Sequence, residues 1–504
     1  QSTSAFHSER HLSAWKHAAD FDSPARGLSV HEMEKTTGNT SAIYTDGSVV
    51  DIARKVISTQ EYDDAFFICD VRDLLSKVEL WKHELPRVTP FYAIKACTDP
   101  VVLKLLKDKD VNFDCSNRRE IATMLDLGTT PDRILYAQTV KNCSHLDYSL
   151  KHGVDLMTFD SAEELDKIHH KDARLLLRII GDEEGCHYTL NKKFGCLISD
   201  APKLLEKARS LGRRVVGIAF HVGCAYTDPS IFVRTIEQAR KIFDLATEMG
   251  FEMSVLDLGG GFPGGLRNKE KFLKVCAALR SALDDQFPPS SGVKILAEPG
   301  QFFVTSAYTL LLKVVGKRKR NLLIDGKVQE YQEVFLSESK RNCITNCIYD
   351  FLDVQFRPLD PPYDRPCNLL STLWGATCSP LDCIADRQLF FDTKPDEWII
   401  VDNMGAYSLV NACGFNGFGF PRVHYVVDPV EASAVSAVLD NLPVEGGYGP
   451  MVEIVKKRPS DNALKKHSIL ENGVIRNGLG ANGFIENGLI QKGFTQNDLV
   501  QSGH

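Results

Sequence analysis

Short apolar runs alternate with amphipathic helical segments between residues 91 and 300, and this alternation constrains the fold more than any other feature of the sequence. Alternating strands and helices predict parallel βα units. Eight strands in about 210 residues favour a closed (β/α)8 barrel, and an open doubly wound sheet is the alternative that the same pattern allows. The predicted strands are Phe91–Lys95, Val111–Cys115, Ile134–Ala137, Leu156–Asp160, Arg174–Ile179, Gly217–Val222, Val255–Gly260 and Lys294–Gly300. The predicted helices include Ala201–Leu211, Ile231–Gly250 and Lys269–Phe287.

The pattern changes after residue 306, where strands follow one another without regular helices between them. They indicate a C-terminal, mainly antiparallel β domain over residues 307–455. We expect residues 65–306 to form the barrel domain. Residues 1–64 are expected to be a polar segment whose early strands, near Ser41 and Ala65, join the β domain. The predicted strands of the β domain are Leu310–Val315, Leu322–Ile324, Glu333–Leu336, Leu389–Phe391, Trp398–Val401 and Val423–Val427.

Residues 456–504 form a tail with a short repeat. Residues 471–500 divide into the five-residue units ENGVI, RNGLG, ANGFI, ENGLI, QKGFT and QNDLV. A period of five can wind a β-solenoid, but six units make too few coils to bury a core, and Asn-Gly pairs favour turns. We expect a flexible tail, with a partner-binding strip as the alternative.

Charge and composition exclude several classes of protein. The 504 residues carry 59 Lys and Arg against 66 Asp and Glu, a net charge of −7, so the basic surplus of a nucleic-acid-binding protein is missing. No apolar run has the roughly 18 residues that a transmembrane helix needs, which argues against a membrane protein. The 14 cysteines show neither the density of a disulfide scaffold nor the paired CxxC motifs of a zinc site. We therefore expect no metal and a reducing, cytoplasmic setting.

The C-terminal ends of the predicted barrel strands carry polar, ionisable or glycine-rich residues. Active sites of (β/α)8 barrels lie at this end of the strands. Polar residues with a purely structural role would show no preference for strand ends, so the clustering predicts an active site there. The residues are Lys95, Asp114, Arg178, His221, Gly259–Gly261 and Glu298.

Three of these features fit the chemistry of pyridoxal phosphate. Lys95 ends a buried strand, where we expect desolvation to lower its pKa and help it to form an imine; a lysine that snorkels at the barrel rim is the alternative. The amides of Gly259–Gly261 predict a phosphate-binding nest, or else only a tight turn. Glu298 either holds a proton on a heteroaromatic nitrogen or pairs with a barrel arginine. Pyridoxal phosphate requires such an amine, such N–H donors and such a carboxyl group.

Several motifs, in the same order along the chain, resemble those of the eukaryotic ornithine decarboxylase family. The resemblance extends from Ala65 to Val427. It implies an alanine-racemase-like barrel with a C-terminal β domain, pyridoxal 5'-phosphate as the cofactor, and a homodimer whose subunits share their active sites. The matching segments are Phe91–Lys95, Phe113–Cys115, Phe220–Gly223, Asp257–Gly264, Ala297–Gly300, Trp374–Gly375 with Cys378, Asn403–Tyr407 and Phe415–Phe418.

The same resemblance implies a role for each matching residue. Lys95 would form the imine with the cofactor, His221 would stack on the pyridine ring, and Glu298 would hold the ring nitrogen. Cys378, supplied by the other subunit, would guide protonation after CO2 leaves, and Phe415 would line the substrate pocket. Further family residues around the cofactor correspond to Asp114, Glu120 and Arg178, and the phosphate cradle corresponds to Gly259, Gly260, Gly261 and Tyr407.

The chain departs from the family pattern near the cofactor phosphate. Cys224 and Ala225 stand where the family has serine and glycine, and Gln301 stands where it has a phosphate-binding arginine. Loss of that charged hydrogen bond predicts a cofactor affinity lower by about 10- to 100-fold. Because the glycine nest remains, we expect weakened binding and not its loss.

A second set of departures lies at the substrate side chain. The two family aspartates that receive the distal ammonium of ornithine align with Glu338 and Ser379, and Lys340 and Arg341 have entered the same stretch. Burying an ammonium without a full partner is costly. The departures therefore make ornithine only the leading candidate substrate.

The sequence thus predicts a pyridoxal-phosphate-dependent amino-acid decarboxylase, a lyase, with ornithine as the leading substrate and putrescine, for polyamine biosynthesis, as its product. One alternative is a non-catalytic homologue resembling antizyme inhibitor, which binds the regulatory protein antizyme. The other is a decarboxylase of a different amino acid, because Glu338 and Ser379 reshape the distal pocket. Retention of Lys95, His221, Glu298 and Cys378 together favours catalysis.

Overall fold

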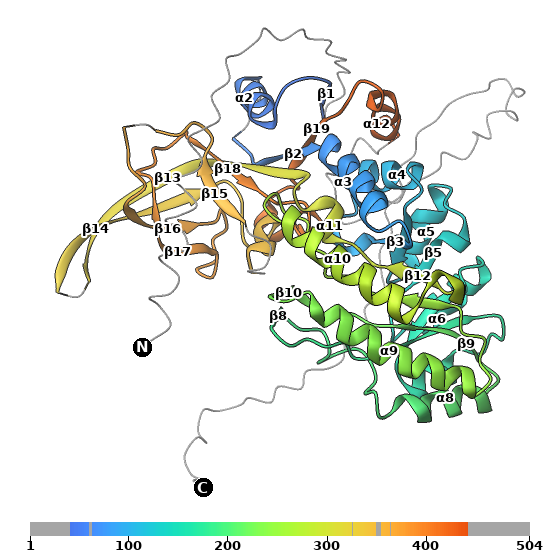
Figure 1. Ribbon diagram of the computed structural model, residues 1–504. Helices are drawn as coiled ribbons and strands as arrows, with labels where there is room; N and C mark the ends of the chain where they lie inside the picture. Colours follow the sequence, from blue (N-terminus) through green and yellow to red (C-terminus); the bar gives the residue numbers. More distant parts are fainter. Residues whose placement is uncertain (1–40, 60–62, 325, 349–353, 363, 442–504) are drawn as a thin grey trace, which may run out of the picture. The chain divides into compact units, whose positions relative to one another are not determined.

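The computed structural model describes residues 41–59, 63–324, 326–348, 354–362 and 364–441 (Figure 1). The chain divides into two units, residues 1–454 and 455–504, and all described residues belong to the first. The predicted tail with its pentapeptide repeats lies outside the described residues, as do residues 1–40 of the predicted polar segment and the predicted end of the β domain at 442–455.

Eight parallel strands close into a barrel in the order β11-β12-β3-β4-β5-β6-β7-β9. Every predicted run overlaps one of them, so the closed barrel is confirmed and the open sheet is excluded. Several strands end earlier than predicted. Lys95 lies in a 3-10 turn, Ile94–Ala96, immediately after β3. The bounds are β3 Val88–Ala93, β4 Asn112–Cys115, β5 Ile134–Tyr136, β6 Leu156–Phe159, β7 Arg174–Arg178, β9 Arg214–Ala219, β11 Val255–Asp257 and β12 Lys294–Ala297.

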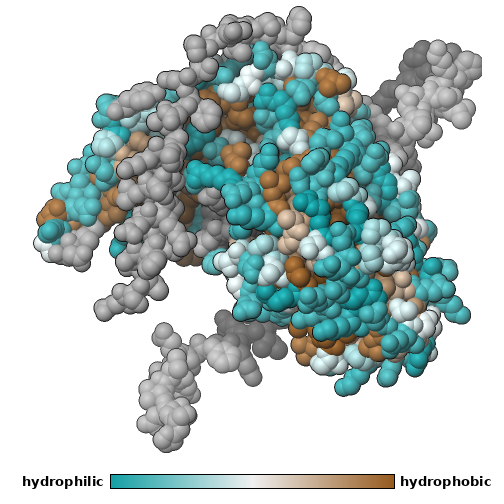
Figure 2. Space-filling model, in the orientation of Figure 1, coloured by the Kyte–Doolittle hydropathy of each residue, from teal (hydrophilic) through white to brown (hydrophobic). Residues whose placement is uncertain are grey.

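Helices cover the outside of the barrel strands (Figure 1). In α9 the buried residues Ile231, Thr235, Ala239, Ile242 and Ala246 recur three or four positions apart and form one inward stripe. The outer face over α9 and α10 is mainly hydrophilic (Figure 2). The bounds are α3 Val71–Glu84, α4 Pro100–Asp108, α5 Arg118–Asp126, α6 Cys143–Lys151, α7 Ala162–Lys167, α8 Ala201–Ser210, α9 Ser230–Glu248, α10 Lys269–Gln286 and α11 Gln301–Val304.

A nine-stranded sheet makes up the β domain. The pairs β1/β19, β2/β19 and β14/β16 are parallel and the other five pairs are antiparallel, so the mainly antiparallel prediction is confirmed. The early strands β1 and β2 join this sheet, as expected. The bounds are β1 Ile43–Tyr44, β2 Phe66–Asp70, β13 Tyr308–Ile324, β14 Lys327–Leu336, β15 Gln355–Pro358, β16 Leu369–Trp374, β17 Cys383–Phe390, β18 Trp398–Asp402 and β19 Arg422–Val426.

The sheet differs from the sequence prediction in three places. The two predicted strands Leu310–Val315 and Leu322–Ile324 are one long strand, β13, because its polar middle continues the pairing with β14. Strands β15 and β16 were not predicted; β16 carries polar Ser371, which is buried and accepts a 2.7 Å hydrogen bond from the Gln332 side chain. Two helices, α2 at Val49–Thr59 and α12 at Ala432–Leu439, also belong to the described part of this region.

A buried carboxylate joins the barrel to the sheet. Asp99 caps the N-terminus of α4, where its side chain accepts from the Val101 amide at 2.8 Å. The Tyr308 hydroxyl of β13 and the Tyr425 hydroxyl of β19 donate to the other oxygen at 2.7 and 2.8 Å. Because Asp99 follows Lys95 by four residues, the segment that carries this lysine is tied to two strands of the sheet.

Candidate active site

The strand ends bring the predicted polar residues together around Lys95. The Lys95 amine forms an ion pair with the Asp114 carboxylate at the end of β4. Glu298 after β12 and Tyr407 lie close enough to act on the charge of the amine, and Lys95 and Arg178 both act on the charge of His221. The structure therefore assembles at one end of the barrel the residues that the sequence placed at separate strand ends.

The pKa of Lys95 moves in the direction opposite to the prediction. Burial by itself lowers the pKa, but the charges of Asp114, Glu298 and Tyr407 raise it above its usual value. The side chain keeps 46% of its surface exposed, which further limits the loss of hydration. The prediction of a lowered pKa was wrong because the sequence did not show how closely the carboxylates approach.

Glu298 forms a coupled pair with Asp257, which the sequence analysis did not select. Burial and then the charges of Asp257 and Asp114 raise the pKa of Glu298 well above its usual value. Burial also raises the pKa of Asp257 to about 6. Because like charges repel in a buried site, the charge of Asp257 disfavours ionisation of Glu298. Asp257 could have been found from its position, because like Asp114 it lies at the end of a barrel strand.

His221 is held in one tautomer by the chain that follows it. Its Nδ1 accepts from the Gly223 amide at 2.9 Å, which leaves the ring proton on Nε2. Burial and the charges of Arg178 and Lys95 lower the pKa of the ring well below its ordinary value. His221 is therefore a neutral, flat ring at neutral pH.

The glycine loop packs tightly against the end of β9. Gly259 and Gly261 adopt φ values of +63° and +92°, and a Cβ on Gly259 would lie 2.1 Å from the Phe220 carbonyl oxygen. A Cβ on Gly261 would lie 2.3 Å from the Gly223 oxygen, and one on Gly260 would lie 2.9 Å from His221 Nε2. Only glycine allows the loop to lie this close to the neighbouring backbone. Packing alone therefore requires these glycines, whether or not the loop also binds a phosphate.

Of three further residues predicted around the cofactor, Tyr407 and Glu120 are held by backbone contacts and Cys224 is buried. Tyr407 has φ = +54°, and its amide donates to the Ala96 oxygen at 2.8 Å, beside Lys95. The Glu120 carboxylate accepts from the Ser116 amide at 2.5 Å. Burial raises the pKa of the Cys224 thiol to about 12, so this residue is a neutral thiol. A non-glycine residue with positive φ next to Lys95 is the kind of backbone strain that is found at functional sites.

The residues present fit pyridoxal phosphate. Two buried carboxyl groups, those of Asp114 and Glu298, act on the Lys95 amine, and a third, that of Asp257, acts on Glu298. Asp114 Oδ1 and Asp257 Oδ2 have no hydrogen-bond partner among the described residues. A protonated ring nitrogen next to Glu298 would supply the positive charge that these groups lack, and Lys95 would meet the aldehyde. Gln301, where the resemblance implied an arginine, is 8% exposed and brings an amide but no charge.

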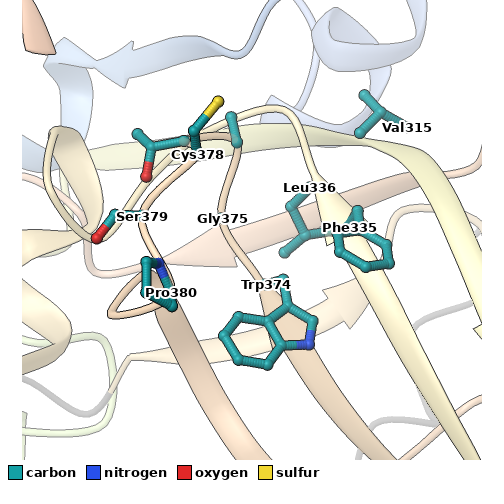
Figure 3. Close-up of a pocket in the computed structure, with 10 residues that line it drawn as sticks. Val315, Phe335, Leu336, Trp374, Gly375, Cys378, Ser379 and Pro380 are labelled. Atoms are coloured by element: carbon teal, nitrogen blue, oxygen red, sulfur yellow. The ribbon is translucent and has the colours of Figure 1, made fainter. Parts of the chain in front are cut away.

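The residues predicted for the substrate end lie on the β domain. Cys378 and Ser379 follow β16 and line a cavity of about 350 Å³ that is walled by residues of β13 and β14 (Figure 3). Cys378 is exposed, and its amide donates to the Asn416 side chain at 3.3 Å. Phe415 is 44% exposed. None of these residues is among the groups that act on Lys95.

Glu338 is not free to receive a substrate ammonium. It is 4% exposed, and its carboxyl group accepts from the Ser339 amide at 2.6 Å and from the Asn342 side chain at 3.1 Å. Burial raises its pKa to about 7. Glu338 therefore carries only part of a negative charge at neutral pH, and both of its oxygens are in use.

Within the parts of the chain that the structure describes, no helix has both the length and the apolar character needed to cross a lipid bilayer. The same residues contain no group of three or more His, Cys, Asp or Glu side chains arranged to hold a metal ion.

Comparison with known proteins identifies what this chain is similar to. Residues 71–305 match the family described as pyridoxal-dependent decarboxylase, pyridoxal binding domain. Ornithine decarboxylase of Mus musculus is 37% identical over 445 residues, which cover 86% of this chain and 94% of that protein. Antizyme inhibitor 2 of Xenopus laevis is 37% identical over 390 residues, 75% of this chain and 84% of that protein.

Solved structures show the same similarity. The crystal structure of the Paramecium bursaria Chlorella virus arginine decarboxylase bound to agmatine superposes with a TM-score of 0.70 at 32% identity. The superposition covers 75% of this chain and 100% of that chain. The fold of this chain is thus shared with a solved arginine decarboxylase.

Proposed function

This chain belongs to the family of pyridoxal-dependent decarboxylases that includes the ornithine decarboxylases, and from that premise we propose that it removes the α-carboxylate of an amino acid at the Lys95 end of the barrel. The observation that carries the proposal is the contact of the Lys95 amine with Asp114, beside the coupled carboxyl groups of Glu298 and Asp257. Ornithine, the substrate in the names of curated relatives, is the reference substrate, and putrescine, a polyamine precursor, would be its product.

Bound pyridoxal phosphate supplies an electron sink for the electron pair that CO2 leaves behind. The residues of this chain bind and orient the reactants. Lys95 provides the amine for the aldehyde, and Asp114 holds that amine in place. Glu298 would hold a proton at the ring nitrogen, and Asp257 is a second buried carboxyl group whose charge acts on Glu298. His221, neutral and fixed by Gly223, provides a flat surface for the ring.

A homodimer would complete the site. Cys378 is exposed at the β domain and is not among the groups around Lys95. We assign to it the delivery of a proton to the substrate Cα in the partner's site, with Ser379 and Phe415 beside it. A cytoplasmic location is consistent with the free thiols of the described cysteines.

The test of the proposed function is CO2 release by the purified full chain loaded with pyridoxal phosphate. We expect release from at least one amino acid and the visible absorbance band of a lysine–cofactor imine, both lost in Lys95→Ala. A protein that shows neither the band nor CO2 release from any amino acid would contradict the proposal. Lys141→Ala is a matched control, because Lys141 is a buried lysine that pairs with Glu164 elsewhere in the barrel.

A second candidate is a non-catalytic protein that binds antizyme. It is favoured by the 37% identity to antizyme inhibitor 2 and by the uncharged Gln301. Co-purification with antizyme, by a protein that neither binds pyridoxal phosphate nor releases CO2, would select this candidate over the enzyme.

A further inference from the structure

Arg341 lies between two residues of the substrate end. Its Nε donates to Ser379 Oγ at 3.2 Å, and its guanidinium lies 5.3 Å from the centre of the Phe415 ring. Among the described residues, the side-chain contacts of Arg341 are these two, and no ion pair with a carboxylate is formed. The cation is therefore held in place by a hydroxyl and an aromatic face, and its charge is not neutralised by the described part of the chain.

The carboxyl groups that lie nearest in the sequence to Arg341 and to Ser379, those of Glu338 and Asp382, are engaged elsewhere. The Glu338 carboxyl group accepts from the Ser339 amide and from the Asn342 side chain, as described above. Asp382 is 1% exposed and accepts from the Ser339 hydroxyl at 2.8 Å, from the Lys340 amide at 2.9 Å and from the Thr377 amide at 3.0 Å. Neither carboxyl group is available to a substrate side chain, and neither forms an ion pair that would neutralise the charge of Arg341.

The cavity beside Ser379 offers donors and apolar walls but no acid. None of the ten residues that line it is an aspartate or a glutamate (Figure 3). Its apolar walls include Val315, Phe335 and Leu336. The Trp374 indole nitrogen is buried and has no hydrogen-bond acceptor among the described residues. The lining residues offer an ammonium group no counter-charge, whereas the Arg341 guanidinium, which is hydrogen-bonded to the lining residue Ser379, is a cation that can bind a carboxylate.

We propose that Arg341 is the specificity-determining residue of this site and that it selects amino acids whose side chain ends in a carboxylate, such as glutamate or aspartate. The inference rests on the proposed function, which places Ser379 and Phe415 at the substrate end. In the reaction the bond from Cα to the α-carboxylate carbon breaks, CO2 leaves, and a proton takes its place on Cα. The side-chain carboxylate is unchanged, so glutamate would give 4-aminobutyrate.

The experiment compares CO2 release from glutamate, aspartate, glutamine, ornithine and lysine by the cofactor-loaded full chain. We expect kcat/KM for an acidic substrate to exceed that for ornithine and for glutamine, the uncharged counterpart of glutamate, by at least about tenfold. In Arg341→Gln the value for the acidic substrate should fall by about 10- to 100-fold, as expected for loss of a charged hydrogen bond.

Two further variants separate recognition from folding. Lys340→Gln removes the neighbouring cation, whose amine donates to the Cys383 oxygen and not to Ser379, and should leave the preference unchanged. Ser379→Asp gives Arg341 an ion-pair partner and should shift the preference from glutamate toward ornithine. The absorbance change of the bound cofactor on addition of each amino acid gives its Kd and tests the same order of preference without turnover.

The outcomes distinguish the two proposals. If ornithine is preferred and Arg341→Gln changes nothing, the inference is overturned while the proposed function stands. If the loaded protein neither releases CO2 nor binds any of the amino acids, both are overturned. A preference for the acidic substrates that Arg341→Gln removes and Lys340→Gln retains would support the inference.

Discussion

The Lys95 amine donates to the buried carboxylate of Asp114, and the two residues come from neighbouring strand ends of the barrel. The contact keeps the amine charged in the free protein, because the charges around it outweigh burial and raise its pKa. Since an amine must be neutral to attack an aldehyde, this carboxylate controls the pH at which the cofactor can be attached.

Asp114→Asn should move cofactor attachment to lower pH. Asp114 raises the pKa of Lys95, so the asparagine lowers it and a larger fraction of the amine is neutral at each pH. The rate at which the cofactor-free protein acquires the imine band, measured across pH, should reach half of its maximum at lower pH than in the parent. Asp155→Asn, which breaks a surface pair with Arg174, is the control and should leave the profile unchanged.

Ala225→Gly should stabilise the protein. Ala225 has φ = +54°, a left-handed conformation that costs an alanine about 1 kcal/mol more than a glycine. The free energy of unfolding, measured in urea, should therefore rise by about 1 kcal/mol. The greater conformational entropy of glycine in the unfolded chain offsets part of this gain. The control is Ala277→Gly, on the exposed side of α10, whose free energy of unfolding should fall by about 1 kcal/mol because glycine has a low helix propensity. A loss at both positions would show that Ala225 is not strained.

The sequence was sufficient to predict the barrel, because strand ends and helix faces follow local periodicity. It also predicted that Lys95, Asp114, His221 and Glu298 would lie together, since the closure of parallel strands brings their ends to one side of the barrel; their roles stay predictions. The direction of the Lys95 pKa could not be predicted in this way. That direction depends on how closely the carboxylates approach the amine, which only the folded chain determines.

Residues between the strands of the β domain were harder to predict. Arg341 and Ser379 are separated by 38 positions in the chain, yet they share a hydrogen bond. Glu338 was expected to face the substrate, but the Ser339 amide and the Asn342 side chain donate to its two oxygens. Such pairings arise from the tertiary arrangement of irregular segments, which have no periodicity from which to infer them.

Glu338→Gln should alter the pH dependence of stability. Burial raises the pKa of Glu338 from its ordinary value to about 7, so the folded protein holds this proton more tightly than the unfolded chain does. The resulting stabilisation is complete below the unfolded pKa and is lost as the pH rises toward 7. The variant should therefore gain about 1 to 3 kcal/mol relative to the parent at pH 8, but not at pH 4. Thermal unfolding of both proteins across this range checks the sign, and an advantage that grows as pH falls would contradict it.

Asp99→Asn should weaken the link between the Lys95 segment and the sheet. Asp99 accepts from Tyr308 and Tyr425 with one oxygen, and an amide cannot serve as the same charged acceptor. We expect a loss of about 1 to 3 kcal/mol in the free energy of unfolding. Tyr308→Phe and Tyr425→Phe should each lose less in the Asp99→Asn background than in the parent, and equal losses would show that the three groups act independently.

The most direct test of the account is borohydride reduction of the cofactor-loaded protein, followed by mass spectrometry of its peptides. Reduction fixes the carbon–nitrogen bond of an imine, so the cofactor remains on the residue that carried it. We predict a pyridoxyl adduct on Lys95 and its disappearance in Lys95→Ala. An adduct on another lysine, or an unmodified Lys95 in protein shown to contain the cofactor, would contradict the assignment on which the proposed chemistry depends.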